Sequence, residues 1–196
     1  MFYWLIRGIG YLSMKAAFSL KYEGKENLKC SDVKVLACNH RSYLDPILLS
    51  LAEKRRCTYM AKEELFKNPV FSLLIRSFGA FPVERGKGDR GVIDQAVEKL
   101  KSGKNLVIFP EGTRSKDGKV GRGKTGVALI AAKSNAYVVP VGIAYEGKLK
   151  FRKKITVRYG TPIRPEDLQI SENPAPRELK ELKLKIMGSI SELVEK

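Results

Sequence analysis

The chain has 196 residues, 43% of them apolar, so its length fits one domain and its composition can fill a hydrophobic core. Lysine and arginine number 37 against 21 acidic residues, and the net charge of +16 favours a polyanionic partner: nucleic acid, anionic lipid headgroups, or an acidic or phosphorylated substrate. One histidine and three scattered cysteines match no metal-ligand spacing, which argues against a zinc site, and such cysteines are typical of reduced thiols in a cytosolic compartment.

Residues 1–20 are the most apolar stretch and predict an amphipathic helix. Five apolar residues share one helical face: Phe2, Leu5, Ile9, Leu12 and Ala16. Arg7 and Lys15 lie on the opposite arc with Lys21, and they interrupt the stretch, so no uncharged run reaches the roughly 18 residues of a membrane span. Charges inside the segment also fit a secretory signal poorly.

The same stretch carries Tyr3, Trp4 and Tyr11, aromatic residues that suit the boundary between bilayer and water. A helix lying in the headgroup plane and a helix packed on the protein core fit this pattern equally well. The prediction is a membrane-interface helix over residues 1–21, followed by a single α/β domain over residues 22–196.

Strands and helices then alternate along the chain. Apolar and β-branched runs predict strands near 21–23 and at 33–38, 57–62, 80–83, 106–109, 137–143 and 155–159. Helical spacing predicts helices at 46–54, 63–77, 89–101 and 124–134, and a last helix with one apolar face: Leu179, Leu182, Ile186, Ile190 and Leu193. The alternation predicts an α/β fold with a largely parallel or mixed sheet and helices on both faces. Pro82 places the 80–83 strand at an edge or a strand end.

The lone histidine follows the first buried strand, in the sequence from Asn39 to Asp45. An imidazole at a strand end can take a proton from a hydroxyl at neutral pH, and a carboxylate on its other nitrogen fixes the tautomer. Asp45 before Pro46 also fits a helix cap with proline at the first helical position, and both roles are compatible. His40 and Asp45 are therefore candidates for a base and its orienter.

Two further strands end in loops suited to anions. Gly112 lets the backbone approach a ligand, and Thr113 and Arg114 add a hydroxyl and a guanidinium, while Arg85 follows the strand at 80–83. If these strands run parallel, the loops and His40 open on the same edge of the sheet. The alternative is that both arginines are solvated surface charges.

Four blocks, in this order, resemble the glycerolipid acyltransferase family. They are Asn39-His40 with Asp45; Gly79, Phe81 and Arg85; the run from Phe109 to Ser115; and the run from Val139 to Ile143. Together they span residues 33–145, and the third block is the most specific. Pro82 and Glu84 depart from the family's pattern in the second block, which leaves the geometry of that strand open.

The resemblance implies that His40 is the general base and Asp45 its orienter. It also implies a set of residues around the acceptor's glycerol phosphate: Arg85, Glu111, Gly112, Thr113 and Arg114, with Lys62 and Lys124 as lesser contacts. The reaction would move an acyl group from a thioester of acyl carrier protein or coenzyme A to the free hydroxyl of lysophosphatidate. The enzyme would need no metal and no cofactor, and would act as a peripheral protein at the cytoplasmic face of a membrane, bound to anionic lipids and not to nucleic acid.

Several alternatives stay open on the sequence. The acceptor could be glycerol-3-phosphate or another lysophospholipid, and Ser42 or Cys38 could carry the acyl group covalently. A noncatalytic lipid-surface protein explains the charge but leaves the His40–Asp45 spacing without a role. A nucleic-acid-binding protein also fits the charge, yet the sequence has no RNP-like aromatic motif, zinc-finger spacing or helix-turn-helix.

Overall fold

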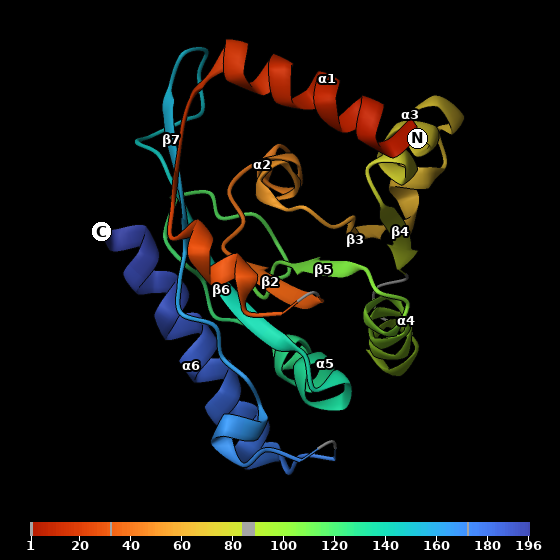
Figure 1. Cartoon of the computed structure of the whole chain (residues 1–196), viewed down its shortest axis with the longest axis vertical. Coiled ribbons are helices and arrows are strands. Elements are labelled where there is room, and N and C mark those ends of the chain that lie inside the picture. The colour runs from red at the N-terminus through yellow and green to blue at the C-terminus, as the bar shows by residue number, and fades with distance from the viewer. Residues whose placement is uncertain (1, 32, 84–88, 172) are drawn as a thin grey trace.

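The computed structural model describes residues 2–31, 33–83, 89–171 and 173–196, and within them a seven-stranded sheet forms the centre of the molecule (Figure 1). The strand order is β1-β7-β6-β2-β5-β3-β4. The strands are β1 (Ser19–Glu23), β2 (Lys34–Cys38), β3 (Cys57–Lys62), β4 (Ala80–Val83), β5 (Asn105–Ile108), β6 (Tyr137–Ala144) and β7 (Lys154–Tyr159). All neighbours are parallel except β6 and β7, so the predicted mixed α/β sheet is confirmed.

Helices cover both faces of the sheet (Figure 1). The α-helices are α1 (Phe2–Ala17), α2 (Asp45–Ala52), α3 (Pro69–Ser77), α4 (Asp89–Lys101), α5 (Gly126–Ser134) and α6 (Pro176–Glu195). Three short 3-10 helices lie between them in the described residues: η1 (Lys25–Lys29), η2 (Glu63–Phe66) and η3 (Glu166–Leu168). α1 and α2 lie on one face and α4, α5 and α6 on the other, while α3 lies beside the amino-terminal end of α1.

The central strand β2 is buried on both sides, which explains its unbroken apolar run. Val35 and Ala37 pack into the cluster under α4, α5 and α6, whereas Leu36 and Cys38 pack into the cluster under α1 and α2. A parallel strand covered by helices on both faces needs no polar alternation. His40 therefore lies two residues after the end of a strand that is packed on both faces.

The structure departs from the prediction at the end of α1 and within the helix predicted over residues 63–77. α1 ends at Ala17 and β1 begins at Ser19, so residues 19–21 belong to the sheet and not to the helix. The helix predicted over 63–77 is split into η2 and α3. Asn68 accepts a hydrogen bond from the Phe71 amide at 3.0 Å and Pro69 follows it, which together start a new helix. Pro82 lies in the edge strand β4, as predicted.

The apolar stripe of α1 faces away from the domain. Leu5, Ile9 and Leu12 are 61%, 54% and 69% exposed, while Met14 on the inner side is buried. Arg7 also turns inward and donates to the Leu51 carbonyl at 2.9 Å. Of the helices in the described part of the chain, none is long and apolar enough to cross a bilayer.

Candidate active site

His40 lies where β2 ends and the chain turns toward α2, and its ring is paired with Asp45. The distance from His40 Nδ1 to Asp45 Oδ2 is 2.8 Å, and the His40 side chain is 19% exposed whereas that of Asp45 is fully buried. A buried carboxylate is an acceptor, so Nδ1 carries the proton and Nε2 keeps the lone pair that can accept another. This is the arrangement of a general base with a fixed tautomer.

The Asp45 carboxylate also holds the loop that leads to it. Oδ2 accepts the amides of Arg41 and Ser42, both at 2.7 Å, and Asp45 lies in the first turn of α2, where the helix dipole favours a negative charge. Leu44, not Asp45, occupies the cap position, so the predicted capping role is corrected. Oδ2 thus binds both the turn and the His40 ring, which limits the freedom of the imidazole to rotate.

Glu111 joins the His40 loop to the loop after β5. One carboxylate oxygen accepts the His40 amide at 3.0 Å and the other accepts the Gly121 amide at 3.2 Å. The Ser115 amide donates in turn to the His40 carbonyl at 2.8 Å. Burial raises the pKa of the Glu111 carboxyl, and the two amide hydrogen bonds oppose that rise. A carboxylate held in this way positions His40 and is poorly placed to meet a phosphate.

Phe109 forms one wall of the His40 site. Its ring stacks on the imidazole with a centroid distance of 4.1 Å and an interplanar angle of 21°. Stacking fixes the plane of the imidazole, as the hydrogen bond to Asp45 fixes its edge. β2 and β5 are parallel neighbours, so Phe109 reaches His40 because both residues follow the same end of the sheet.

Arg114 lies close to the His40 loop through a contact with Tyr43. Its Nη2 donates to the Tyr43 hydroxyl at 2.8 Å, and its guanidinium carbon lies 3.7 Å from the centre of the Tyr43 ring. Tyr43 is 69% exposed. The predicted meeting of the loops after β2 and β5 is therefore present, with an exposed arginine at its rim.

Lys124 packs over the glycine of the same loop. Gly112 has φ +75°, and a Cβ there would lie 3.1 Å from Cε and 3.3 Å from Nζ of Lys124. The Lys124 amide donates to the Pro110 carbonyl at 2.8 Å, so the 111–124 loop closes on itself. Thr113 is exposed beside Arg114. The ammonium group and the guanidinium thus belong to one loop next to His40.

The other predicted phosphate residues stand further from this contact network. Lys62 is exposed at the carboxyl end of β3, on the same edge of the sheet but two strands from β2. Arg85 falls within residues 84–88, outside the residues that the structure describes. Across the described part of the chain, no three His, Cys, Asp or Glu side chains gather in a way that could hold a metal ion.

The two side chains considered for a covalent route are used structurally. Cys38 is buried, and burial raises the pKa of its thiol well above the ordinary value, which disfavours a thiolate. The Ser42 hydroxyl accepts the Leu44 amide at 3.2 Å within the turn. Asn39, from the first sequence block, pairs with β6 instead: its side chain donates to the Ile143 carbonyl at 3.0 Å and accepts the Ile143 amide at 2.8 Å.

The local sequence pattern does not indicate the contacts that Phe109 and Tyr43 make in the site. The apolar run predicts a strand through Phe109, whereas β5 ends at Ile108, so Phe109 lies just beyond the strand. Tyr43 lies between His40 and Asp45 in the sequence. Its partner is 71 positions away, and no local pattern indicates such a contact.

Comparisons with known proteins show which family the chain resembles. The protein family described as Acyltransferase matches residues 19–144. The chain is 36% identical over 143 residues to a chloroplastic 1-acyl-sn-glycerol-3-phosphate acyltransferase of Arabidopsis thaliana, a match that covers 70% of this chain and 39% of the relative. It is 30% identical over 178 residues to the 1-acyl-sn-glycerol-3-phosphate acyltransferase of Streptococcus pneumoniae, covering 86% and 65%.

A relative of more similar length and a solved structure extend the match. The 1-acyl-sn-glycerol-3-phosphate acyltransferase of Bacillus subtilis is 35% identical over 155 residues, covering 76% of this chain and 75% of the relative. The crystal structure of the 1-acyl-sn-glycerophosphate (LPA) acyltransferase PlsC from Thermotoga maritima has a TM-score of 0.74 at 28% identity, covering 97% of this chain and 79% of that one. The chain spans less than two thirds of the Arabidopsis and Streptococcus relatives, yet the family match covers more than half of it. The chain belongs to the acyltransferase family.

Proposed function

We propose that the protein transfers an acyl group from a thioester to the free hydroxyl of lysophosphatidate, which yields phosphatidate. The observation that carries this proposal is the 2.8 Å contact of His40 Nδ1 with the buried Asp45 carboxylate, beside a loop that presents Arg114. Relatives named as 1-acyl-sn-glycerol-3-phosphate acyltransferases, and a solved structure of one, support the choice of acceptor. The donor is a thioester of acyl carrier protein or coenzyme A.

The proton follows a short path in the proposed reaction. Nε2 of His40 takes the proton of the acceptor hydroxyl as the oxygen attacks the thioester carbonyl. The tetrahedral intermediate then expels the thiolate, which leaves with the proton held by His40, so the ester and the free thiol are formed and the imidazole is restored. Asp45 stabilises the imidazolium between these steps without taking its proton.

The negative charges of the acceptor and of the intermediate need separate partners. Arg114, Lys124 and Thr113 are proposed for the phosphate, with Arg85 and Lys62 as further candidates from the family resemblance. Glu111 is assigned to positioning His40, because both of its carboxylate oxygens accept backbone amides. The amides of His40, Arg41 and Ser42 already donate to carboxylates, and the oxyanion donors are proposed to come from the 111–124 loop.

The acceptor is an amphiphile of the bilayer, and the exposed helix faces suit work at that boundary. The apolar stripe of α1 is uncovered, and four apolar residues of the neighbouring α3 are exposed as well: Val70, Phe71, Leu73 and Leu74. Contiguous exposed apolar surface of this kind marks an interaction site. We therefore propose that the enzyme is a peripheral membrane protein. We propose the cytoplasmic face because thiols stay reduced in the cytosol.

Product analysis with a panel of acceptors and donors tests the reaction. Purified protein should form phosphatidate from lysophosphatidate with a thioester of acyl carrier protein or of coenzyme A, and the faster of the two identifies the donor. No product from lysophosphatidate with either donor, while another acceptor is acylated, would refute the proposed substrate.

A lyso-ornithine lipid deserves a place in that panel because of one relative. The lyso-ornithine lipid O-acyltransferase of Pseudomonas aeruginosa is 34% identical over 109 residues, covering 55% of this chain. Such an acceptor lacks the phosphate for which Arg114 and Lys124 are proposed. If the enzyme prefers the lyso-ornithine lipid, Arg114 and Lys124 must have another role than binding a phosphate, whereas the roles of His40 and Asp45 are unchanged.

A further inference from the structure

The proposed membrane face of α1 lacks most of the positive charge that the sequence pattern predicted from Arg7, Lys15 and Lys21. Arg7 is half-buried and donates to the Leu51 carbonyl, so its guanidinium serves the fold. Lys21 lies in β1 and pairs with Glu23 at 2.7 Å. Lys15 stays exposed near the Tyr11 ring. Strong attraction of α1 to anionic headgroups therefore requires cations from a neighbouring element.

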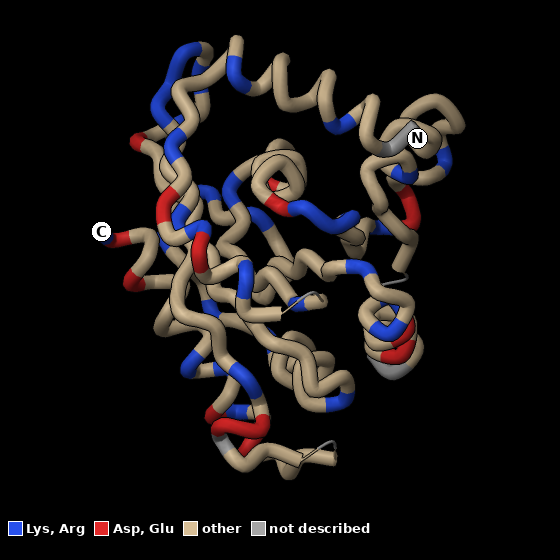
Figure 2. The backbone as a smooth tube through the Cα atoms, viewed as in Figure 1, with Lys and Arg blue, Asp and Glu red and all other residues tan. Residues whose placement is uncertain are grey.

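The connection between β6 and β7 supplies such cations, and residues 145–153 are here named the basic loop. It carries four positive residues against the single acid Glu146: Lys148, Lys150, Arg152 and Lys153. Figure 2 shows this concentration of lysine and arginine beyond the carboxyl end of α1. Among these charges lies Phe151, whose side chain is 73% exposed. A large aromatic side chain exposed between cations suits an anionic membrane surface better than it suits water.

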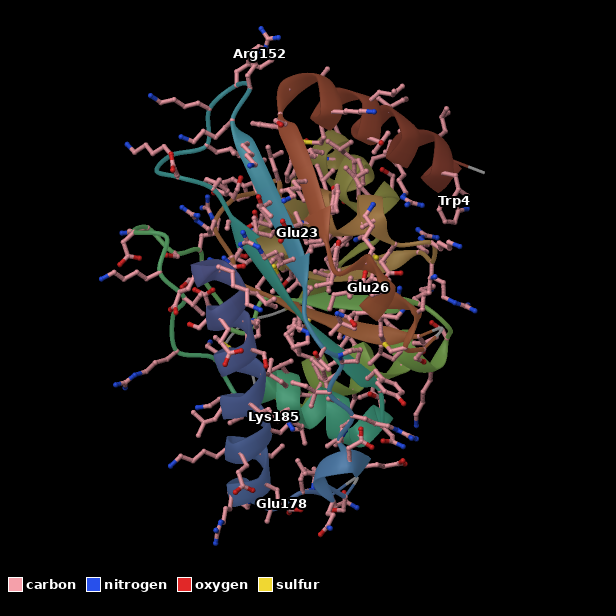
Figure 3. All side chains as sticks on the ribbon, turned by 60° about the vertical axis from the view of Figure 1, so that its left-hand side comes forward. Trp4, Glu23, Glu26, Arg152, Glu178 and Lys185 are labelled. Atoms are coloured by element: carbon pink, nitrogen blue, oxygen red, sulfur yellow. The ribbon has the colours of Figure 1, made fainter. Side chains whose placement is uncertain are left out.

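The basic loop is bonded directly to the end of α1. The Arg152 amide donates to the Ala17 carbonyl at 2.6 Å, and the Ser19 amide donates to the Lys153 carbonyl at 3.1 Å. Arg152 has φ +62°, a left-handed conformation that residues other than glycine seldom adopt. Its side chain points away from the protein at the tip of the loop (Figure 3). α1 and the loop therefore present their exposed side chains from one joined structure.

The other end of the basic loop is hydrogen-bonded to the His40 loop. Arg41, the residue after His40, donates from Nη1 to the Tyr145 carbonyl at 2.6 Å and from Nη2 to the Gly147 carbonyl at 3.3 Å. Its guanidinium carbon also lies 3.9 Å from the centre of the Tyr145 ring. The basic loop and the residue after the proposed base are thus held together by the Arg41 side chain.

We propose that the basic loop is a second membrane contact, in which Phe151 enters the interface and the loop's cations meet the phosphates of anionic lipids. This inference rests on the proposed placement of α1 at the bilayer. A helix alone can rotate or tilt in the headgroup plane, whereas a helix and a bonded loop define an orientation. Through Arg41, that orientation sets where the His40 site stands relative to the membrane.

Sedimentation with vesicles tests the inference on the full chain. The variant Lys148→Gln, Lys150→Gln, Arg152→Asn keeps the left-handed position with a residue that tolerates it. At about 1 kcal/mol for each of the three basic residues near the surface, its partition onto vesicles of phosphatidylcholine mixed with phosphatidylglycerol should fall about a hundredfold. Phe151→Ala should weaken binding to these vesicles and to pure phosphatidylcholine vesicles alike.

Matched controls come from α6, which carries exposed residues of the same kinds. Arg177→Gln, Lys180→Gln, Lys185→Gln removes the same charge from that helix, and Leu184→Ala removes a side chain that is 55% exposed. Both should bind vesicles like the wild type. Equal loss of binding in the loop and α6 variants would overturn the inference, because net charge alone would then explain it.

Two further measurements distinguish the membrane contact from the proposed reaction and from binding of a carrier protein. Turnover of lysophosphatidate dispersed in detergent should be the same in the loop variant and the wild type. If the wild type shows no such turnover but the loop variant still loses vesicle binding, the proposed reaction is wrong and the membrane contact is supported. Binding of an acyl carrier protein is the other measurement. A loop variant that loses the acidic carrier protein and keeps the vesicles would assign the basic loop to a protein partner and contradict a membrane contact.

Discussion

At the scale of single residues, Asp45 decides what His40 can do. One buried oxygen receives the imidazole and two backbone amides, so the carboxylate sets the tautomer, the ring position and the course of the turn. Removing its charge while keeping its shape should therefore affect chemistry more than folding.

Asp45→Asn provides that test. The asparagine oxygen in the place of Oδ2 would keep both amides but lose the charge that stabilises the imidazolium. An NH₂ group in that place would lose both amides and favour the tautomer with the proton on Nε2, which cannot act as a base. We expect kcat to fall by about 10²–10⁴ and the free energy of unfolding by about 1–3 kcal/mol. Steady-state kinetics and urea unfolding measure both. Asp94→Asn, which breaks only the exposed 3.1 Å pair with Lys133, is the control, and a kcat loss no larger than in that variant would contradict the role of Asp45.

Tyr43 is expected to position Arg114 for the acceptor. Tyr43→Ala removes both the ring under the guanidinium and the hydroxyl, while Tyr43→Phe removes the hydroxyl alone. A cation–π contact at an exposed site is worth about 0.5–1 kcal/mol, so the alanine variant should raise KM for lysophosphatidate about twofold to fivefold, with a smaller effect for phenylalanine and little change in kcat. A fall in kcat at constant KM would show that Tyr43 acts on the chemical step instead.

A buried ion pair at the amino-terminal end of β2 predicts a pH dependence of stability. Lys34 Nζ and Glu53 Oε1 are 3.6 Å apart and almost fully buried. Burial raises the pKa of Glu53 above its ordinary value of 4.5, and the nearby Lys34 offsets only part of that rise. The folded chain therefore holds this proton more tightly than the unfolded chain, so the Glu53 contribution to stability falls as the pH rises from about 4.5 through the raised pKa.

Glu53→Gln should remove that fall. The variant has no proton to lose in this range, so its free energy of unfolding should drop less with rising pH than that of the wild type. Urea unfolding at several pH values, with the exposed Glu64→Gln as control, measures the difference. A wild-type-minus-variant difference that stays constant from acid to neutral pH would count against the raised pKa.

At the scale of elements, the sequence predicted each of the seven strands in the described residues, most clearly the central ones, which are buried on both faces. Runs such as Val35 to Cys38 leave a continuous apolar signal, and the proline of β4 indicated an edge. The strand order and the antiparallel β7 were beyond local patterns, since they depend on which distant segments pair. The convergence of the His40 and Glu111–Arg114 loops followed from parallel strands, whereas the direction of the Glu111 carboxylate depends on a contact across 71 positions.

α1 is the element whose two interpretations the sequence could not separate. Its stripe is exposed and its inner side is partly polar, so substitution on the stripe should spare the fold. Leu5→Ser, Ile9→Ser, Leu12→Ser should weaken binding to vesicles about a hundredfold or more, since burying each such side chain fully contributes roughly 1.5–3 kcal/mol. Thermal unfolding should change little, in contrast to Met14→Ser, which disturbs a buried contact. Deletion of residues 1–20 is less informative, because it also cuts into β1.

Wild-type vesicle binding by the triple serine variant would contradict the membrane role of α1. If the variant instead unfolds at a clearly lower temperature, the stripe is part of the packed fold and the alternative interpretation of residues 1–20 is correct.

At the scale of the whole molecule, the charge of +16 is distributed among unlike tasks. Arg7 and Arg41 bind backbone carbonyls inside the fold, Arg114 and Lys124 line the proposed acceptor site, and the basic loop faces outward beside α1. Composition could indicate a polyanionic partner but not this division, since each task depends on where the fold places a side chain. The family match then favours lipid over nucleic acid as that partner.

The central claim is that one imidazole removes the proton of an esterifiable hydroxyl. The direct test is the initial rate of phosphatidate formation by purified His40→Ala, with lysophosphatidate and the preferred thioester donor at saturation. A positioned base contributes about 10²–10⁴ in rate, so we predict a loss of at least that size with thermal unfolding close to that of the wild type. A folded His40→Ala protein that forms phosphatidate at the wild-type rate would contradict the claim.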